Sequence, residues 1–166
     1  VTNHPFSFAD DTKILSIREK DSLSSLQQDL NRLLQWCEDN SMTFNSDKCH
    51  VLPFLSEGTS LFMNETQLEQ VQTEKDLGVY ISSSLKWTAH IEATCTKATR
   101  VFFMIQRSTA TLLSTQHRLN LYKSLMMPIL TYACEIWSPS ISNLTKLESV
   151  QRKATKWILK YQDLSY

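Results

Sequence analysis

Two adjacent carboxylates, Asp10 and Asp11, are the side chains of this 166-residue chain whose type and spacing best suit chemistry. Apolar residues flank the pair on both sides: Phe6, Phe8, Ile14, Leu15 and Ile17. This pattern predicts a β-hairpin with the two acids at its turn. Adjacent acids cannot both be buried without a counter-charge, so they face water, as in an ordinary surface turn, or hold a cation. The rigid flanks favour a cation, and carboxylate oxygens suit Mg²⁺.

A second feature able to bind a ligand is a basic face near the end of the chain. The formal net charge is zero, yet residues 1–85 contain 6 basic and 13 acidic side chains, whereas residues 86–166 contain 11 basic and 4 acidic ones. Wound as a helix, the last segment collects cations on one arc opposite an apolar face: Lys146, Arg152, Lys153, Lys156 and Lys160. Such an arc favours contact with nucleic-acid phosphates over an ordinary solvated face.

The first half is expected to mix strands with one helix. Asp21 and Ser22 are N-cap residues for an amphipathic helix that closes near Asn40. Short strands are expected at 42–44, 51–54 and 61–63, the last in a hairpin whose turn is 64–65. Residues 76–81 are expected to form one further strand, in which Gly78 permits a bulge.

The second half is expected to be helical, with Thr88, Thr115 and Ser142 as N-caps. The predicted helices are 88–105, 115–127, 129–137 and 142–161. The second is expected to bend or end before Pro128, because the residue before a proline disfavours the helical conformation. The sequence therefore predicts an α+β fold that divides near residue 86.

Five segments in order resemble a known family. FADD resembles the F/YxDD box of reverse transcriptases, and the set resembles the enzymes of non-LTR, LINE-type retrotransposons. After FADDTKI come DLNRLLQWCEDNSMTFNSDKC, KDLGVYISSSLKWTAHI, LYKSLMMPILTYACEIWSP and LESVQRKATKWI, which together span nearly the whole chain. The resemblance implies an RNA-directed DNA polymerase. Residues 1–85 would be the C-terminal part of its palm (β-hairpin, helix and short antiparallel strands), and residues 86–166 an all-α thumb.

The resemblance also implies roles for individual residues. Asp10 and Asp11 match the paired catalytic, metal-binding aspartates, which implies Mg²⁺ or Mn²⁺ and two-metal nucleotidyl transfer onto a primer 3′-hydroxyl. Lys48 matches a lysine that acts as proton donor or electrostatic partner of the pyrophosphate, although its sequence context alone favours a solvated lysine. The segment that supports the primer end is matched by Leu77, Gly78 and Val79, which otherwise form an ordinary buried strand.

The implied partners are an RNA template, a DNA primer, deoxynucleoside triphosphates and the upstream palm and fingers, with action in the nucleus on a genomic target. The family's first metal-binding aspartate lies upstream of FADD and is absent here, so the fragment alone is expected to be inactive. The alternatives are a non-catalytic nucleic-acid-binding remnant and a product with no selected role. Residues packing on the absent palm are expected to be under-covered, namely Phe6, Phe8 and Val79.

Composition excludes several other classes. Two glycines leave no room for a Gly-rich phosphate loop. The four cysteines form no CxxC motif and indicate buried hydrophobes in a reducing compartment, with a zinc site at Cys49 and His50 as a weakly spaced alternative. The sequence shows neither a signal peptide nor a run long enough to span a membrane, which predicts a soluble, intracellular protein.

Overall fold

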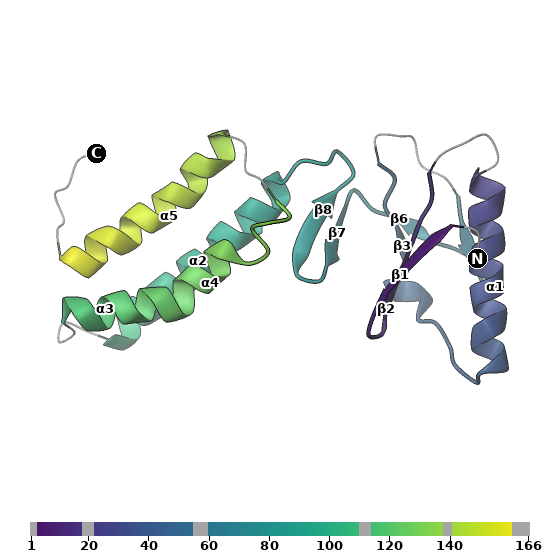
Figure 1. The fold of residues 1–166 in the computed structure, drawn as a ribbon, viewed down its shortest axis with the longest axis horizontal. Coiled ribbons are helices and arrows are strands. Elements are labelled where there is room, and N and C mark those ends of the chain that lie inside the picture. Colours follow the sequence, from purple (N-terminus) through teal and green to yellow (C-terminus); the bar gives the residue numbers. More distant parts are fainter. Residues whose placement is uncertain (1–2, 18–21, 55–59, 110–113, 138–140, 161–166) are drawn as a thin grey trace. The chain divides into compact units, whose positions relative to one another are not determined.

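The computed structural model describes residues 3–17, 22–54, 60–109, 114–137 and 141–160 (Figure 1). The chain forms two compact units, Val1–Glu74 and Lys75–Tyr166. The first unit combines a helix with small two-stranded sheets, and the second combines one hairpin with a helical bundle. This mixture of helices and small sheets agrees with the predicted α+β class, while the assignment to palm and thumb stays a prediction.

The first unit begins with the predicted hairpin, formed by β1 (His4–Phe8) and β2 (Asp11–Leu15). The strands are antiparallel, and Phe8 pairs with Asp11 at the tip. The turn therefore consists of Ala9 and Asp10, one residue earlier than the predicted pair of acids. Ala9 has a φ of 54°, because a two-residue hairpin loop needs a positive φ to match the right-handed twist of its strands.

Helix α1 (Ser22–Asp39) follows, with bounds close to the predicted ones. It ends in a Schellman-type arrangement, in which the Met42 N–H donates to the Cys37 carbonyl at 2.8 Å and Ser41 has a φ of 55°. Its apolar side packs on a small core whose fully buried members are Leu30, Leu61, Met63 and Leu68. The apolar periodicity thus specified both the helix and the side that is buried.

The remaining strands of the first unit are short. The hairpin of β4 (Phe62–Met63) and β5 (Thr66–Gln67) confirms the predicted turn, where Asn64 and Glu65 both have positive φ. Strand β3 (His50–Val51) pairs with β6 (Glu69–Gln70) in parallel, so the expectation of antiparallel strands only is wrong. The strand predicted at 42–44 is absent. An irregular segment leads there into the 3₁₀ turn η1 (Ser46–Lys48), whose N-cap Asn45 accepts from the Asp47 N–H.

The segment predicted as one strand over 76–81 is a hairpin instead. Strand β7 (Thr73–Asp76) and strand β8 (Val79–Ser82) pair across a two-residue turn. Leu77 and Gly78, with φ values of 44° and 87°, form that turn. Two successive residues with positive φ give a turn compatible with strand twist. The physical role of Gly78 is therefore to reverse the chain rather than to bulge a strand.

The described residues of the second unit include four α-helices after β8. They are α2 (Thr88–Thr109), α3 (Thr115–Leu121), α4 (Met127–Thr131) and α5 (Ile141–Leu159). Ser114 caps α3 by accepting from the His117 N–H, so Thr115 is its first residue and not the predicted cap. Likewise Ser142 lies inside α5. The helix predicted over 129–137 is wrong beyond Thr131, where the chain turns.

The helix before Pro128 neither ends nor breaks. A π-helical segment, η3 (Tyr122–Met126), joins α3 to α4, and Pro128 stands in the first turn of α4. Proline has no N–H and its ring crowds the carbonyl four residues earlier, so an α-helical continuation would be strained. Widening the preceding turn to an i→i+5 pattern removes that conflict and lets the helical path continue.

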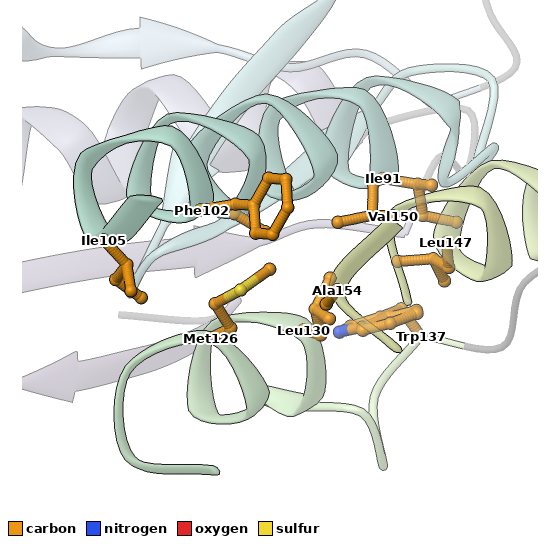
Figure 2. Close-up of a cluster of buried hydrophobic side chains, with 10 residues drawn as sticks. Ile91, Phe102, Ile105, Met126, Leu130, Trp137, Leu147, Val150 and Ala154 are labelled. Carbon is orange, nitrogen blue, oxygen red and sulfur yellow. The ribbon is translucent and has the colours of Figure 1, made fainter. Parts of the chain in front are cut away.

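The helices of the second unit enclose one apolar core (Figure 2). Ile91, Phe102 and Ile105 come from α2, and Met126 and Leu130 from η3 and α4. Leu147, Val150 and Ala154 project from α5 onto the same centre, and Trp137 closes one end. With Ala98 of α2 included, the core residues of each helix recur at spacings of three, four or seven, which leaves the opposite side of each helix to solvent. No helix in the described part of the chain is long and apolar enough to cross a membrane.

Candidate functional site

The two acids predicted to bind metal lie at the tip of the first hairpin. Asp10 occupies the second turn position, and Asp11 begins β2 opposite Phe8. Both residues are exposed. A side-chain hydrogen bond between Ser7 and Thr12, 3.4 Å long, ties the two strands just behind the tip. Short paired strands thus present two carboxylates to solvent, as a cation ligand pair requires, but no group of three or more potential metal ligands occurs among the described residues.

Lys48 ends the 3₁₀ turn η1 and is exposed. Its backbone N–H donates to the Asn45 carbonyl at 3.1 Å, so the turn holds its main chain while the ammonium group is available. In the described part of the chain no ion pair joins Lys48 to Asp10 or Asp11. The structure thus places the acids side by side at the hairpin tip, Asp10 in the turn and Asp11 at the start of β2, and the described residues show no ion pair between them and Lys48.

The predicted primer-grip residues form the β7–β8 turn and the start of β8. Leu77 is exposed, whereas Val79 is buried at 3% exposure. The expectation that Val79 would be under-covered is therefore wrong, because its side chain is buried. By contrast Phe6 and Phe8 are exposed as expected, at 56% and 65%.

The turn is held by residues that no local sequence motif singles out. The Tyr132 hydroxyl donates to the Leu77 carbonyl at 2.8 Å, and the Trp137 indole N–H donates to the Tyr132 carbonyl at 2.9 Å. Trp137 in turn lies beside His90, with 5.2 Å between ring centroids. Nδ1 of His90 accepts from the Tyr80 N–H at 3.3 Å, and burial lowers the pKa of this imidazole. The hairpin is thus joined to the helices at two points.

The basic face of α5 has acidic partners at two of its five cations. Lys146 pairs with Glu92 of α2 at 2.6 Å, and Arg152 pairs with Glu148 one turn earlier at 2.8 Å. No ion pair among the described residues involves the other three cations, which are Lys153, Lys156 and Lys160. Sequence reasoning missed the partner from α2, since nothing local connects residues 54 positions apart.

A zinc site at Cys49 and His50 gains no support from the described residues, where no suitable ligand cluster occurs. His50 instead pairs through Nδ1 with Glu74 at 2.9 Å. Burial raises the pKa of the Cys49 thiol, which disfavours the thiolate that would bind a metal. This geometry fits the interpretation of Cys49 as a small, partly buried side chain.

Three exposed residues of α2 form a feature that sequence reasoning missed. Arg100, Phe103 and Arg107 line a shallow open groove of about 360 Å³. Their spacing of three and four residues places them on one face of the helix. The signal was present in the sequence, because an apolar aromatic between two arginines on a helix face is an unusual solvent-facing pattern.

The chain is similar in sequence to RNA-directed DNA polymerases of mobile elements from Drosophila melanogaster. It is 27% identical over 175 residues to the "RNA-directed DNA polymerase from mobile element jockey", a match that covers 95% of this chain and 19% of that protein. It is 24% identical over 162 residues to the "Probable RNA-directed DNA polymerase from transposon X-element", with 92% and 18% covered.

The chain thus spans about a fifth of the length of these curated relatives. No protein-family model and no solved structure matches it. Both matches extend over nearly all of the chain. They confirm the resemblance to the reverse transcriptases of non-LTR retrotransposons that the motifs indicated.

Proposed function

We propose that this chain is a segment of an RNA-directed DNA polymerase of a non-LTR retrotransposon, which extends a primer 3′-hydroxyl along an RNA template. The observation that carries the proposal is the exposed pair Asp10 and Asp11 on a paired hairpin, within a chain of which 95% aligns with the jockey polymerase. Phosphoryl transfer depends on positioned charge rather than on covalent catalysis, so rigidly held carboxylates are the essential contribution of this segment.

The hairpin tip fits a divalent cation as part of a larger site. Both carboxylates are exposed oxygen donors, the type of ligand that Mg²⁺ prefers. Since the described residues supply no third ligand nearby, the remaining ligands are water, substrate phosphates and a carboxylate from an upstream strand. When bound, the metal stabilises negative charge on the oxygens that exchange at phosphorus. We expect the 166-residue chain alone to be inactive, because two carboxylates do not complete such a site.

Lys48 is proposed to neutralise the pyrophosphate or to donate a proton to it. Its ammonium group is exposed, and the hydrogen-bonded 3₁₀ turn fixes its backbone. An ammonium is a compact cation with three donors, which suits a phosphate oxygen. The Leu77–Gly78 turn is proposed to support the primer end, because it projects from a hairpin that Tyr132 holds in place.

Helix α5 is proposed to contact the phosphates of the primer–template duplex. Lys153, Lys156 and Lys160 carry the proposal, since none has an ion pair among the described residues. Lys146 and Arg152 would have to exchange their acidic partners for phosphate. Phosphate contacts position a duplex without reading its bases, which a polymerase that copies any sequence requires.

A primer-extension assay tests the catalytic part of the proposal, with the reading frame that contains this chain and its upstream palm. Asp10→Asn and Asp11→Asn are each expected to lower kcat at least about 100-fold, because each removes charge from the metal site. Asp47→Asn is the matched control, an exposed acid in η1 of the same unit, and should keep wild-type activity. Wild-type extension by the Asp10→Asn, Asp11→Asn double variant would contradict the proposal.

Calorimetric titration of the 166-residue chain tests the metal site directly. Mg²⁺ or Mn²⁺ is expected to bind only weakly, because most of the coordination shell is water. The double aspartate variant should abolish that binding. Sub-micromolar binding that survives the double substitution would place the metal elsewhere.

A second candidate function is a non-catalytic nucleic-acid-binding remnant of such an element. The observation that favours it is the basic face of α5, which needs no metal to grip a polyanion. The two functions separate in the extension assay. A remnant would bind duplex with salt-sensitive affinity but would not extend a primer even with the upstream segment present.

A further inference from the structure

The outer face of α2 combines an exposed aromatic ring with two arginines. Phe103 is 50% exposed although it belongs to a helix with a well-formed buried side. Arg100 lies three residues before it and Arg107 four residues after it, and the three side chains line one open groove. The buried Phe102 contacts Phe103 from behind, with ring centroids 5.6 Å apart and planes tilted by 52°. The exposed ring thus rests on the core.

The two arginines are placed so that each retains donors for a ligand. Nε of Arg107 donates to the Phe103 carbonyl at 3.3 Å, which ties the side chain to the preceding turn of the helix and leaves the terminal N–H groups for other acceptors. Arg100 is exposed and makes no ion pair among the described residues. At 1.5 Å per residue the two arginines are about 10 Å apart along the helix axis.

This face of α2 is uniformly basic. Residues 93–109 include Lys97, Arg100 and Arg107 and no acid. Glu92, the acid nearest in sequence, is paired with Lys146. A partner with negative charges and flat apolar rings complements such a face, which describes a polynucleotide whose bases are unpaired. A duplex would offer phosphates, but its stacked pairs would not admit the Phe103 ring.

We propose that this α2 groove, defined by Arg100, Phe103 and Arg107, binds single-stranded nucleic acid. One base stacks on the Phe103 ring, and the flanking phosphates contact the two arginines. The site is distinct from the α5 face, which is proposed to hold duplex. The inference depends on the proposed function only in taking nucleic acid as the class of ligand. With both sites, the helical unit binds an unpaired template or product strand at α2 and the primer–template duplex at α5.

The test is fluorescence anisotropy of the full 166-residue chain with a labelled single-stranded oligonucleotide of mixed sequence. Phe103→Ala is expected to weaken binding about 5- to 150-fold, because one stacked base contributes about 1–3 kcal/mol. Phe103→Trp should keep the affinity of the wild-type chain, because tryptophan also offers a ring on which a base can stack. An abasic oligonucleotide of the same length should bind the wild type and Phe103→Ala equally, since it has no ring to stack.

The arginines are tested through salt dependence. Arg100→Gln and Arg107→Gln should each reduce the log–log slope for single strands by about 0.7, because each variant neutralises one phosphate fewer. Lys123→Gln removes one exposed charge outside the groove and serves as the matched control, with an unchanged slope. Circular dichroism should show wild-type helicity for every variant, because the three groove residues are exposed.

Two results would overturn the inference. The first is wild-type affinity of Phe103→Ala for single strands, or equal loss of affinity for the abasic oligonucleotide. The second is failure of the unmodified chain to bind single strands at low salt while it still binds duplex. In both cases the proposed polymerase function would stand, because it rests on the acidic hairpin and on duplex binding by α5.

Discussion

The hydroxyl of Tyr132 donates a hydrogen bond to the backbone carbonyl of Leu77, with 2.8 Å between the two oxygens. The bond joins the turn that follows α4 to the β7–β8 turn, across 55 residues of sequence. The Tyr132 ring also lies against the turn, because a Cβ built on Gly78 would meet its Cε1 at 3.1 Å. Two of the segments that resemble reverse transcriptases, KDLGVYI and LTYACEIW, thus meet at Tyr132 and the Leu77–Gly78 turn.

Tyr132→Phe is expected to lower the free energy of unfolding by about 0.5–1 kcal/mol, since it removes one partly solvated hydrogen bond and keeps the ring. Urea unfolding followed by circular dichroism measures the change. Tyr122→Phe is the control, because Tyr122 is a partly buried tyrosine of the same unit away from the turn. Equal losses for the two variants would show that the hydrogen bond to Leu77 has no special weight.

Gly78→Ala is expected to destabilise the chain by about 1–3 kcal/mol. The φ of 87° is unfavourable for alanine, and the added Cβ would crowd Tyr132. A double-mutant cycle with Tyr132→Ala separates the two causes. The crowding term should disappear without the ring, so the loss should be smaller in that background. An identical loss in both backgrounds would assign the whole cost to the backbone.

His90 predicts a stability that depends on pH. Burial lowers the pKa of this imidazole below its value of about 6.5 in the unfolded chain. A proton on Nδ1 would also replace the hydrogen bond from the Tyr80 N–H by two N–H groups that face each other. The unfolded chain therefore binds more protons between the two pKa values, so stability rises with pH there. The contribution is complete above about pH 6.5 and is lost as the pH falls toward the lower folded pKa.

Urea unfolding across the range from mildly acidic to neutral pH measures this dependence. His90→Asn should flatten the profile even if it lowers stability throughout. His4→Asn, an exposed histidine of β1, serves as the control and should leave the slope assigned to His90 in place. A slope that persists unchanged in His90→Asn would refute the assignment.

Arg118 is expected to stabilise the join between α3 and the end of α5. It is buried at 7% exposure, donates to the Trp157 carbonyl at 2.6 Å and places its guanidinium 5.2 Å from the Trp157 ring centroid. Arg118→Met should keep much of the packing but remove a charge-assisted hydrogen bond and a cation–π contact, at a cost of about 2–3 kcal/mol. Thermal unfolding measures it, and a melting temperature equal to wild type would contradict the role.

The α5 face predicts salt-dependent binding of duplex without sequence preference. Replacing Arg152, Lys153, Lys156 and Lys160 by Gln should reduce the log–log salt slope by up to about four units if each contacts one phosphate. Duplexes of different sequence should respond alike, because phosphates carry no base identity. Helicity should be retained, since the apolar face that includes Val150 and Ala154 is untouched. Wild-type affinity and slope in the quadruple variant would contradict the assignment.

Much of the fold and of the acidic site follows from short-range pattern. The hairpin around Asp10, helix α1 and the Asn64–Glu65 turn were predicted, because apolar spacing and turn-forming residues act within a few positions. The same reasoning failed at Leu77 and Gly78, because the residues around them favour a single strand although the chain reverses direction at this point. Two left-handed residues are stable there because the paired strands and the distant Tyr132 hold them.

The sequence by itself determined which residues are candidates for chemistry: the adjacent acids Asp10 and Asp11, Lys48 and the cations of the last helix. Only the tertiary structure decided which of them have partners. Lys146 is paired with Glu92 of another helix, and Val79 is buried. Such pairings depend on packing between segments far apart in the chain, whereas helical and strand periodicities depend on neighbours one turn or one residue away.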